Sequence, residues 1–393
     1  MRRAVPVLLA TLLVLASGGS GIAVAPPSGA EQEARAPIEA VSTNTTAVLT
    51  LQEIEASTFA RADLVVTGAL ASQSTAAVAA FERHRVEQAL SAARTAEADR
   101  QVIVNATDWA ERQTTRLLAE ERSARIAYRR GEVSASTYLA TLGSIHRSAG
   151  HVEARLERLR PLATDPATID RIDALIATLR TLQGPVRADL ARAVQGSGPS
   201  DRVFVAVSET GVTLSHRTET RFVRETIRFD NRNDRVGQMA FDEAERRFAE
   251  LYPWASENKQ RISMGALGAD VYVVEYTHTH GTVHAALDAS TGLVFREVQT
   301  KSLSSMPVDW RTWAPGNETR VSISRTYAGG PLAVQVTNGT GAPLSGTVVV
   351  NGTEVGSTGP DGTLWTVSPA GEFHVRVTTP DASFEATLDV SDR

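Results

Sequence analysis

Three closely spaced histidines are the residues whose type and spacing come nearest to a metal site. His278, His280 and His284 are candidates because neutral imidazole is a common metal ligand. Residues two apart on a strand share a face, so His278 and His280 lie together. If His280 and Gly281 form a two-residue turn, His284 lies on the opposite face, and only a longer turn would bring all three together. No HExxH motif accompanies them, and we predict a solvated hairpin tip without a metal.

Paired carboxylates could supply a general acid and a general base, and Glu120 with Glu121 is one such pair. Both lie on a predicted helix beside Arg122 and Arg125, where i,i+4 ion pairs on a solvated face are the ordinary interpretation. The chain has neither a GxSxG nucleophile elbow nor a glycine-rich phosphate loop. We therefore predict no catalytic residues and no cofactor, which argues against a metal-dependent hydrolase.

Asparagines of this chain are concentrated in acceptor sites for N-glycosylation. Five of the eight belong to Asn-X-Ser/Thr sequons, which is more than chance would give and is typical of exported chains. The five predicted glycosylation sites are Asn44, Asn105, Asn317, Asn338 and Asn351.

The N-terminus agrees with export to an extracellular or cell-surface location. Arg2 and Arg3 precede an apolar run from Ala4 to Ala16, which has the length of a secretory h-region. Cleavage after Ala30 makes residues 1–30 a signal peptide. The alternative is an uncleaved anchor, since the stretch 4–25 is nearly long enough to span a bilayer. We predict no other transmembrane segment.

Composition removes several further classes of function. The chain has no cysteine, which excludes disulfides and thiolate metal sites. Its net charge is -5 without a basic block, so nucleic-acid binding has no electrostatic footprint. Only Lys259 and Lys301 are lysines among 40 basic residues. This arginine bias, together with the sequons, fits a salt-adapted archaeon.

Composition shifts divide the mature chain into domains. Residues 31–50 are rich in Ala, Pro, Ser and Thr and are predicted to be a linker. Residues 51–196 are poor in glycine and proline and are predicted to form an all-α bundle or helical hairpin. The clearest helix carries an unbroken heptad seam that could pack within the chain or against a partner helix. The seam consists of Tyr138, Leu142, Ile145, Ala149, Val152, Leu156 and Leu159.

The remaining residues change to strand patterns. Residues 201–305 combine strands with one amphipathic helix, Met239 to Tyr252, and are predicted to form an α+β domain. A second linker covers 306–317. Residues 318–393 contain short strands and Asn-Gly and Asp-Gly turns, which predict an all-β sandwich of the immunoglobulin-like kind.

Two stretches resemble known families. The run from Ala285 to Val294, with a preceding helix at Phe241 and a strand from Tyr272 to Tyr276, resembles the closing part of PepSY domains. That resemblance implies binding to, or inhibition of, a protease.

The runs from Val336 to Val348, from Thr358 to Thr363 and from Pro369 to Phe373 resemble carboxypeptidase-regulatory-like domains, which are transthyretin-like sandwiches without catalysis. The whole architecture, including the run from Leu251 to Trp254, is similar to uncharacterised exported proteins of halophilic archaea.

We therefore expect an exported binding or structural protein without catalytic activity, which meets a protein partner at the cell envelope. The alternative is a modulator or inhibitor of an extracellular protease that acts through the PepSY-like domain. One helix covers only one face of a small sheet, so Tyr272, Val274 and Tyr276 could form a partner-binding face. The helical domain could cover that face instead.

Overall fold

The computed structural model describes residues 38–39, 44–62, 80–82, 84–198, 201–233, 239–268, 270–316 and 319–389. Within this part, a helical region precedes antiparallel sheets, and the protein is multi-domain, as the composition shifts predict. The predicted signal peptide lies outside the described residues. No helix in the described part of the chain is long and apolar enough to cross a membrane.

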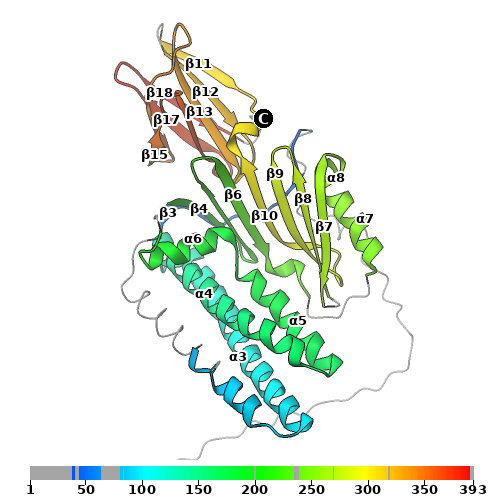
Figure 1. Cartoon of the computed structure of the whole chain (residues 1–393). Helices are drawn as coiled ribbons and strands as arrows, with labels where there is room; N and C mark the ends of the chain where they lie inside the picture. The colour runs from blue at the N-terminus through cyan, green and yellow to red at the C-terminus, as the bar shows by residue number, and fades with distance from the viewer. Residues whose placement is uncertain are drawn as a thin grey trace, which may run out of the picture. The chain divides into compact units, whose positions relative to one another are not determined.

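Local sequence sets the two longest helices, α3 (Ala96–Arg129) and α4 (Ala135–Leu159). The Thr95 hydroxyl accepts a backbone N–H at the start of α3, and the Ser134 hydroxyl does the same for α4. Gly131, with φ of 71°, allows the chain to reverse between the helices. Every residue of the heptad seam on α4 is buried within this chain. The seam is therefore internal packing, and Figure 1 shows α3, α4 and α5 side by side.

Two shorter helices follow. Asp165 caps α5 (Pro166–Thr181), which starts with proline at its first position. Gly184 precedes α6 (Pro185–Val194), which also starts with proline.

The helices pack on an eight-stranded antiparallel sheet, whose strand order is β3-β4-β5-β6-β10-β9-β8-β7. The hairpin predicted around the three histidines is confirmed as the antiparallel pair β8 and β9. The strands are β3 (Ala56–Arg61), β4 (Arg202–Val207), β5 (Gly211–Arg217), β6 (Arg221–Arg228), β7 (Lys259–Leu267), β8 (Val271–His278), β9 (Gly281–Asp288) and β10 (Val294–Ser302).

The start of the sheet lies where the sequence predicts other structure. Strand β3 falls in the range predicted to be helical, and it pairs with β4, with Phe59 opposite Phe204. In the predicted N-terminal linker, β1 (Ile38–Glu39) pairs with β2 (Val48–Leu49). Such short strands have too few residues to show a readable period. They form because their partner strands and buried surroundings stabilise them.

The sheet is covered on both faces. On the first face, α4 and α6 contribute Tyr138 and Leu190 to an apolar cluster with Val205 and Leu214. On the second face lie residues 44–54 together with α7 (Phe241–Leu251) and α8 (Pro253–Glu257). The single helix expected in this region is thus α7 continued by the short α8.

The C-terminal residues form a β-sandwich around a separate apolar core. Its two four-stranded sheets have the orders β11-β12-β13-β16 and β15-β14-β17-β18. Strand β11 lies within the predicted second linker and is drawn into the sandwich by pairing with β12. The strands are β11 (Arg311–Gly316), β12 (Thr319–Arg325), β13 (Pro331–Asn338), β14 (Thr347–Val350), β15 (Thr353–Ser357), β16 (Thr363–Val367), β17 (Phe373–Thr378) and β18 (Ser383–Leu388).

Candidate functional site

The neighbouring central strands β6 and β10 carry buried charged side chains toward both faces of the sheet. Alternation along each strand decides which face each residue serves. Glu225 and Arg296 point to the face covered by α6. The second face receives a polar row from the same strands, and its members are Arg224, Arg228, Glu297, Gln299 and Lys301.

Glu297 is the centre of this polar row. Its Oε1 atom lies 3.2 Å from Arg224 Nη1. Its Oε2 atom accepts hydrogen bonds from the Tyr252 hydroxyl at 2.7 Å and from the backbone N–H of Leu49 at 2.9 Å. Burial raises the pKa of Glu297, while Arg224 opposes that rise. The carboxylate is therefore surrounded by three donors from three separate segments.

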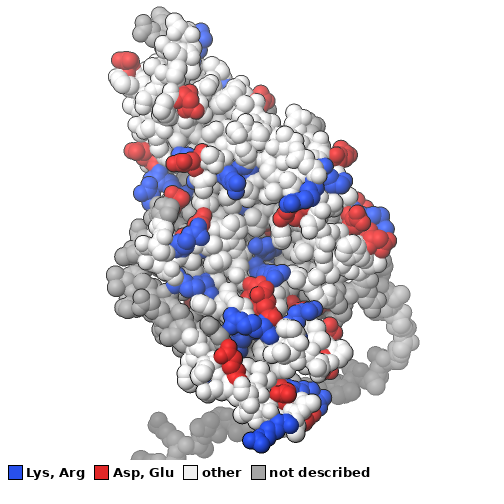
Figure 2. Space-filling view, in the orientation of Figure 1, with Lys and Arg blue, Asp and Glu red and all other residues white. Residues whose placement is uncertain are grey.

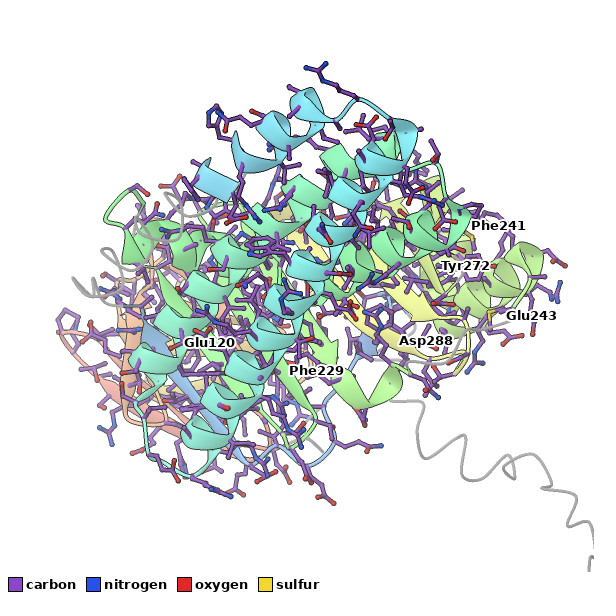
Figure 3. All side chains as sticks on the ribbon, turned by 90° about the horizontal axis from the view of Figure 1, so that it is seen from below. Glu120, Phe229, Phe241, Glu243, Tyr272 and Asp288 are labelled. Atoms are coloured by element: carbon purple, nitrogen blue, oxygen red, sulfur yellow. The ribbon has the colours of Figure 1, made fainter. Side chains whose placement is uncertain are left out.

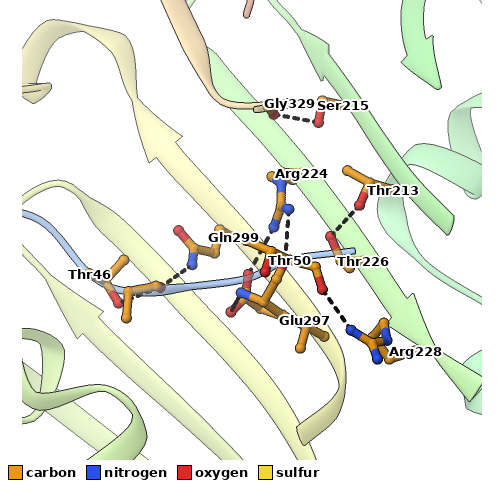
Figure 4. A network of polar contacts seen from close by, with 12 residues as sticks. Thr46, Thr50, Thr213, Ser215, Arg224, Thr226, Arg228, Glu297, Gln299 and Gly329 are labelled. Atoms are coloured by element: carbon orange, nitrogen blue, oxygen red, sulfur yellow. Dashed lines mark hydrogen bonds and ion pairs between the residues drawn. The ribbon is translucent and has the colours of Figure 1, made fainter. Parts of the chain in front are cut away.

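The row holds residues 44–50, which we call the strap, mainly by its main chain (Figure 4). Arg224 Nη2 donates to the Leu49 carbonyl at 2.8 Å, and Gln299 Nε2 donates to the Ala47 carbonyl at 2.8 Å. Arg228 Nη1 donates to the Thr50 carbonyl at 3.2 Å. These bonds satisfy polar groups that are buried with the strap.

Apolar side chains of the strap complete its attachment. Ala47 and Leu49 are buried in one cluster with Phe248 and Tyr252. Main-chain hydrogen bonds combined with pockets for alternate side chains are how proteins hold extended peptides. The second face of the sheet therefore holds the chain's own strap in the way that proteins hold extended peptides.

Lys301 closes one end of the row and is fully buried. Its Nζ atom lies 3.2 Å from the Thr45 hydroxyl and 5.1 Å from the centre of the Tyr327 ring. Burial lowers the pKa of Lys301 to about 7, although Glu297 opposes that change. The amine thus titrates near neutral pH.

On the other face, Glu225 performs a comparable structural task. Its Oε2 atom accepts from the backbone N–H of Val186 at 3.1 Å, and its Oε1 atom lies 3.3 Å from Arg187 Nε. A carboxylate at the first turn of α6 satisfies free N–H groups and complements the helix dipole. Gly184 leaves the space that the carboxylate occupies.

The three histidines separate as predicted, but the turn differs and the hairpin tip is not solvated, because His278 is 3% exposed and His280 is half-buried. His278 pairs with Gly281, so the two turn residues are Thr279 and His280. His280 stacks on Trp254 with ring centres 5.0 Å apart, and His278 meets the same ring edge-on at 5.1 Å.

His284 lies on the opposite face of the hairpin, 3.5 Å from Arg296 Nη1. In the described residues, no group of three His, Cys, Asp or Glu side chains is placed to hold a metal.

The prediction that Tyr272, Val274 and Tyr276 form an uncovered face for a partner is wrong. Val274 and Tyr276 are each 1% exposed, under α7 and α8, and Tyr272 is half-buried. Phe241 packs edge-on against Tyr272, and Figure 3 shows the two side chains together. The opposite face of the same strand is covered by α5, through Ala177. Helices therefore cover both faces of β8, because α5 of the helical domain packs on the face opposite to α7 and α8.

The acidic pair on α3 is also only partly as expected. Glu120, labelled in Figure 3, is half-buried, but Glu121 is 1% exposed. Its Oε1 atom lies 3.2 Å from Arg125 Nε, and burial raises its pKa. Arg125 also donates to the carbonyls of Ser208 and Glu209. The i,i+4 pair exists, but it links α3 to the sheet instead of lying on a solvated face.

Four predicted glycosylation sites lie in the described residues. Asn44, Asn105 and Asn351 are exposed, and Asn338 is half-buried with its Oδ1 atom accepting in its own turn. Asn317 lies outside the described residues. Figure 2 shows acidic and basic side chains interspersed on the visible face.

Sequence reasoning missed the charged row on β6 and β10. The available signal was the polar stretch 218–229, in which Phe222, Val223 and Ile227 stand among charged residues. A strand with apolar residues on both faces is buried on both faces, so its charges must find partners within the protein.

Family models match three consecutive stretches of the chain. Residues 1–199 match a domain of unknown function (DUF7096), and residues 203–307 match a family of unknown function (DUF7094). Residues 312–386 match an archaeal fibronectin-III type-like domain, which agrees with the archaeal origin indicated by composition. No curated protein and no solved structure matches the chain.

Proposed function

This chain belongs to the family described as a domain of unknown function (DUF7096), and we propose that it is an exported binding or structural protein of the cell envelope that acts without catalysis. The observation that carries the proposal is the use made of the buried polar row. Arg224, Glu297 and Gln299 each bond the strap. Groups of the kind that catalyse reactions in other proteins are here engaged in holding the chain's own backbone.

The surface proposed for a protein partner is the edge strand β7. It is the last strand of the sheet and pairs with β8 on one side. Residues 259–263 are exposed, and Ile262 is 38% exposed. An exposed strand edge offers free N–H and C=O groups to an extended segment of another protein. This edge replaces the covered face around Tyr276 as the proposed docking surface.

Two neighbouring proline substitutions test the edge. Successive N–H groups on a strand point in opposite directions, so Ile262→Pro and Ser263→Pro differ in which side they affect. One removes a bond to β8, and the other removes a donor from the free edge. The variant that leaves the β8 pairing intact should stay folded by circular dichroism and lose capture of envelope proteins. If that folded variant captures the same proteins as the wild type, β7 is not the docking surface.

A second candidate function is modulation of an extracellular protease through a PepSY-like middle domain. The order of α7 and α8 followed by β7, β8, β9 and β10 supports the resemblance. Incubation of the purified chain with culture medium should then retain a protease whose activity falls on binding. Retention of envelope proteins without any protease would leave only the first function.

The C-terminal sandwich supports a surface location in this proposal. It forms the turns on which the carboxypeptidase-regulatory-like resemblance rests, at Asn338-Gly339 and Asp361-Gly362. Sandwiches of this kind are common in surface proteins. Its role in the proposed function is to present the rest of the chain at the envelope.

A further inference from the structure

Arg296, on the first face of the sheet, is an arginine without a carboxylate partner. Its Nη2 atom donates to the Gln183 carbonyl at 3.2 Å, and its Nη1 atom lies 3.5 Å from His284 Nδ1. Among the described residues, no aspartate or glutamate forms an ion pair with its guanidinium group. The guanidinium is therefore held in place by neutral groups alone.

The charges nearest to Arg296 are already compensated. An ion pair of 3.3 Å joins Arg187 to Glu225, and one of 2.7 Å joins Arg180 to Glu153. Burial lowers the pKa of Arg296, Glu225 opposes that change, and Arg187 adds to it. One positive charge thus remains for which the described residues supply no counter-ion.

Two histidines present N–H groups beside this arginine. His146 Nδ1 accepts from the backbone N–H of Gly184 at 3.4 Å. Gly184 follows Gln183, whose carbonyl holds Arg296. His284 Nδ1 faces Arg296 Nη1, which can only donate. Burial lowers the pKa of His146 to about 4 and also lowers that of His284, so both rings are neutral near pH 7 and carry their proton on Nε2.

The unused donors of these three side chains reach solvent. Arg296, His146 and His284 are each half-buried. The Nε atom of Arg296 and the Nε2 atoms of both histidines bond no described residue, and each of these atoms keeps surface in contact with solvent. An incoming group can therefore contact them without a change of fold.

The sheet beyond Arg296 is only partly covered on the same face. Val298 and Thr300 follow Arg296 at intervals of two and share its face. They lie opposite His284 and Thr282 on β9, and all four side chains are half-buried. This part of the face offers a polar and weakly apolar surface to the remainder of a ligand.

We propose that Arg296, with His146 and His284 beside it, binds a carboxylate group of a peptide chain, either an acidic side chain or a C-terminus. The planar guanidinium matches the geometry of a carboxylate. A single negative charge suits the one uncompensated arginine, whereas a phosphate would bring a second charge close to Glu153 and Glu225. The site is separate from the free edge of β7, so its test does not depend on docking there.

Histidine ring signals of the full chain, labelled selectively for nuclear magnetic resonance, test the site. N-acetylglutamate α-amide supplies a side-chain carboxylate, and N-acetylalanine supplies a C-terminal one. The corresponding uncharged amides are the controls. At constant ionic strength, we expect saturable shifts of the His146 and His284 signals with at least one carboxylate, with Kd on the order of 1 mM, and none with the amides. The tighter of the two carboxylates identifies the source, and His374 of the C-terminal sandwich is the internal reference.

Two variants of Arg296 show whether the guanidinium is the binding group. Arg296→Gln should weaken binding by about tenfold or more, because the charge-assisted hydrogen bonds are lost. Arg296→Lys keeps the charge without the planar fork and should lie between Arg296→Gln and the wild type. The control Arg246→Gln removes an exposed arginine paired with Asp242 on α7 and should leave Kd unchanged.

The wild-type titration does not depend on the folding of a variant. Absence of a saturable shift at both His146 and His284 in the wild type would overturn the proposal. So would equal shifts with carboxylates and amides, or an unchanged Kd in an Arg296→Gln protein whose other histidine signals match those of the wild type.

Discussion

Arg224 Nη1 lies 3.2 Å from Glu297 Oε1, and the two side chains are almost completely buried on one face of the sheet. Desolvation of two charges offsets much of their attraction, so such a pair contributes little stability by itself. Its structural value lies in its remaining atoms. Arg224 Nη2 and Glu297 Oε2 bond the carbonyl and the N–H of Leu49. The pair thus recognises one residue of the strap by both of its backbone groups.

The substitution Glu297→Gln should therefore destabilise the protein strongly. It leaves Arg224 buried without its counter-ion, which costs about 3–5 kcal/mol. The free energy of unfolding from urea titration measures this loss. The control Glu385→Gln disrupts an exposed pair with Arg376 and should cost less than about 1 kcal/mol. A loss below about 1 kcal/mol for Glu297→Gln would contradict the role given to the pair.

Stability should rise between pH 7 and pH 9 because of Lys301. Its pKa is about 7 in the folded protein, below its ordinary value of 10.5. Between these values the unfolded chain binds a proton that the folded chain has released. The free energy of unfolding therefore increases with pH, by up to about 1.4 kcal/mol per pH unit from this group.

Urea titrations at several pH values measure that slope. Lys301→Met should flatten it, whereas Lys259→Met, which removes the exposed lysine of β7, should leave it unchanged. An unaltered slope in Lys301→Met would show that another group is responsible.

Gly184→Ala should be far more costly than an ordinary glycine substitution. A Cβ atom at Gly184 would lie 2.0 Å from Glu225 Oε2, so the carboxylate would have to leave the start of α6. Overpacking of this kind costs about 1–3 kcal/mol, and more if Arg187 loses its partner. The control Gly265→Ala meets only Val273 Cγ2, at 3.8 Å, and should change the free energy of unfolding by less than about 0.5 kcal/mol. Equal effects of the two substitutions would contradict the close packing at Gly184.

Native material should begin at Glu31 and exceed the polypeptide mass through glycosylation. Asn351 is exposed, with φ of 47°, at the turn between β14 and β15. Asn105 lies on α3, and the hydroxyl of its sequon residue Thr107 is buried and bonded to the Ile103 carbonyl. Asn351→Gln should therefore lower the intact mass by one glycan, whereas Asn105→Gln should not if the glycan is added to the folded chain. Unmodified protein that retains Met1 would contradict export.

The sequence by itself determined the elements whose signals are local. Each of these signals lies within a short stretch of sequence. They are the caps at Ser134 and Asp165, the heptad seam of α4 and the strand pattern of the β8–β9 hairpin. These features depend on residues two to seven positions apart, so a short stretch of sequence is sufficient to identify them.

Only the tertiary structure decided how these elements cover one another and what the polar residues do. Leu49 and Glu297 are 248 residues apart, and no local pattern links them. Tyr276 became a core residue, and Glu121 a buried one, because separate elements pack on the strand and the helix that carry them. The spacing of residues along a helix or strand shows which side chains share a face. Whether that face is buried depends on what packs against it. That dependence is why the strap and its polar row could not be derived from the sequence.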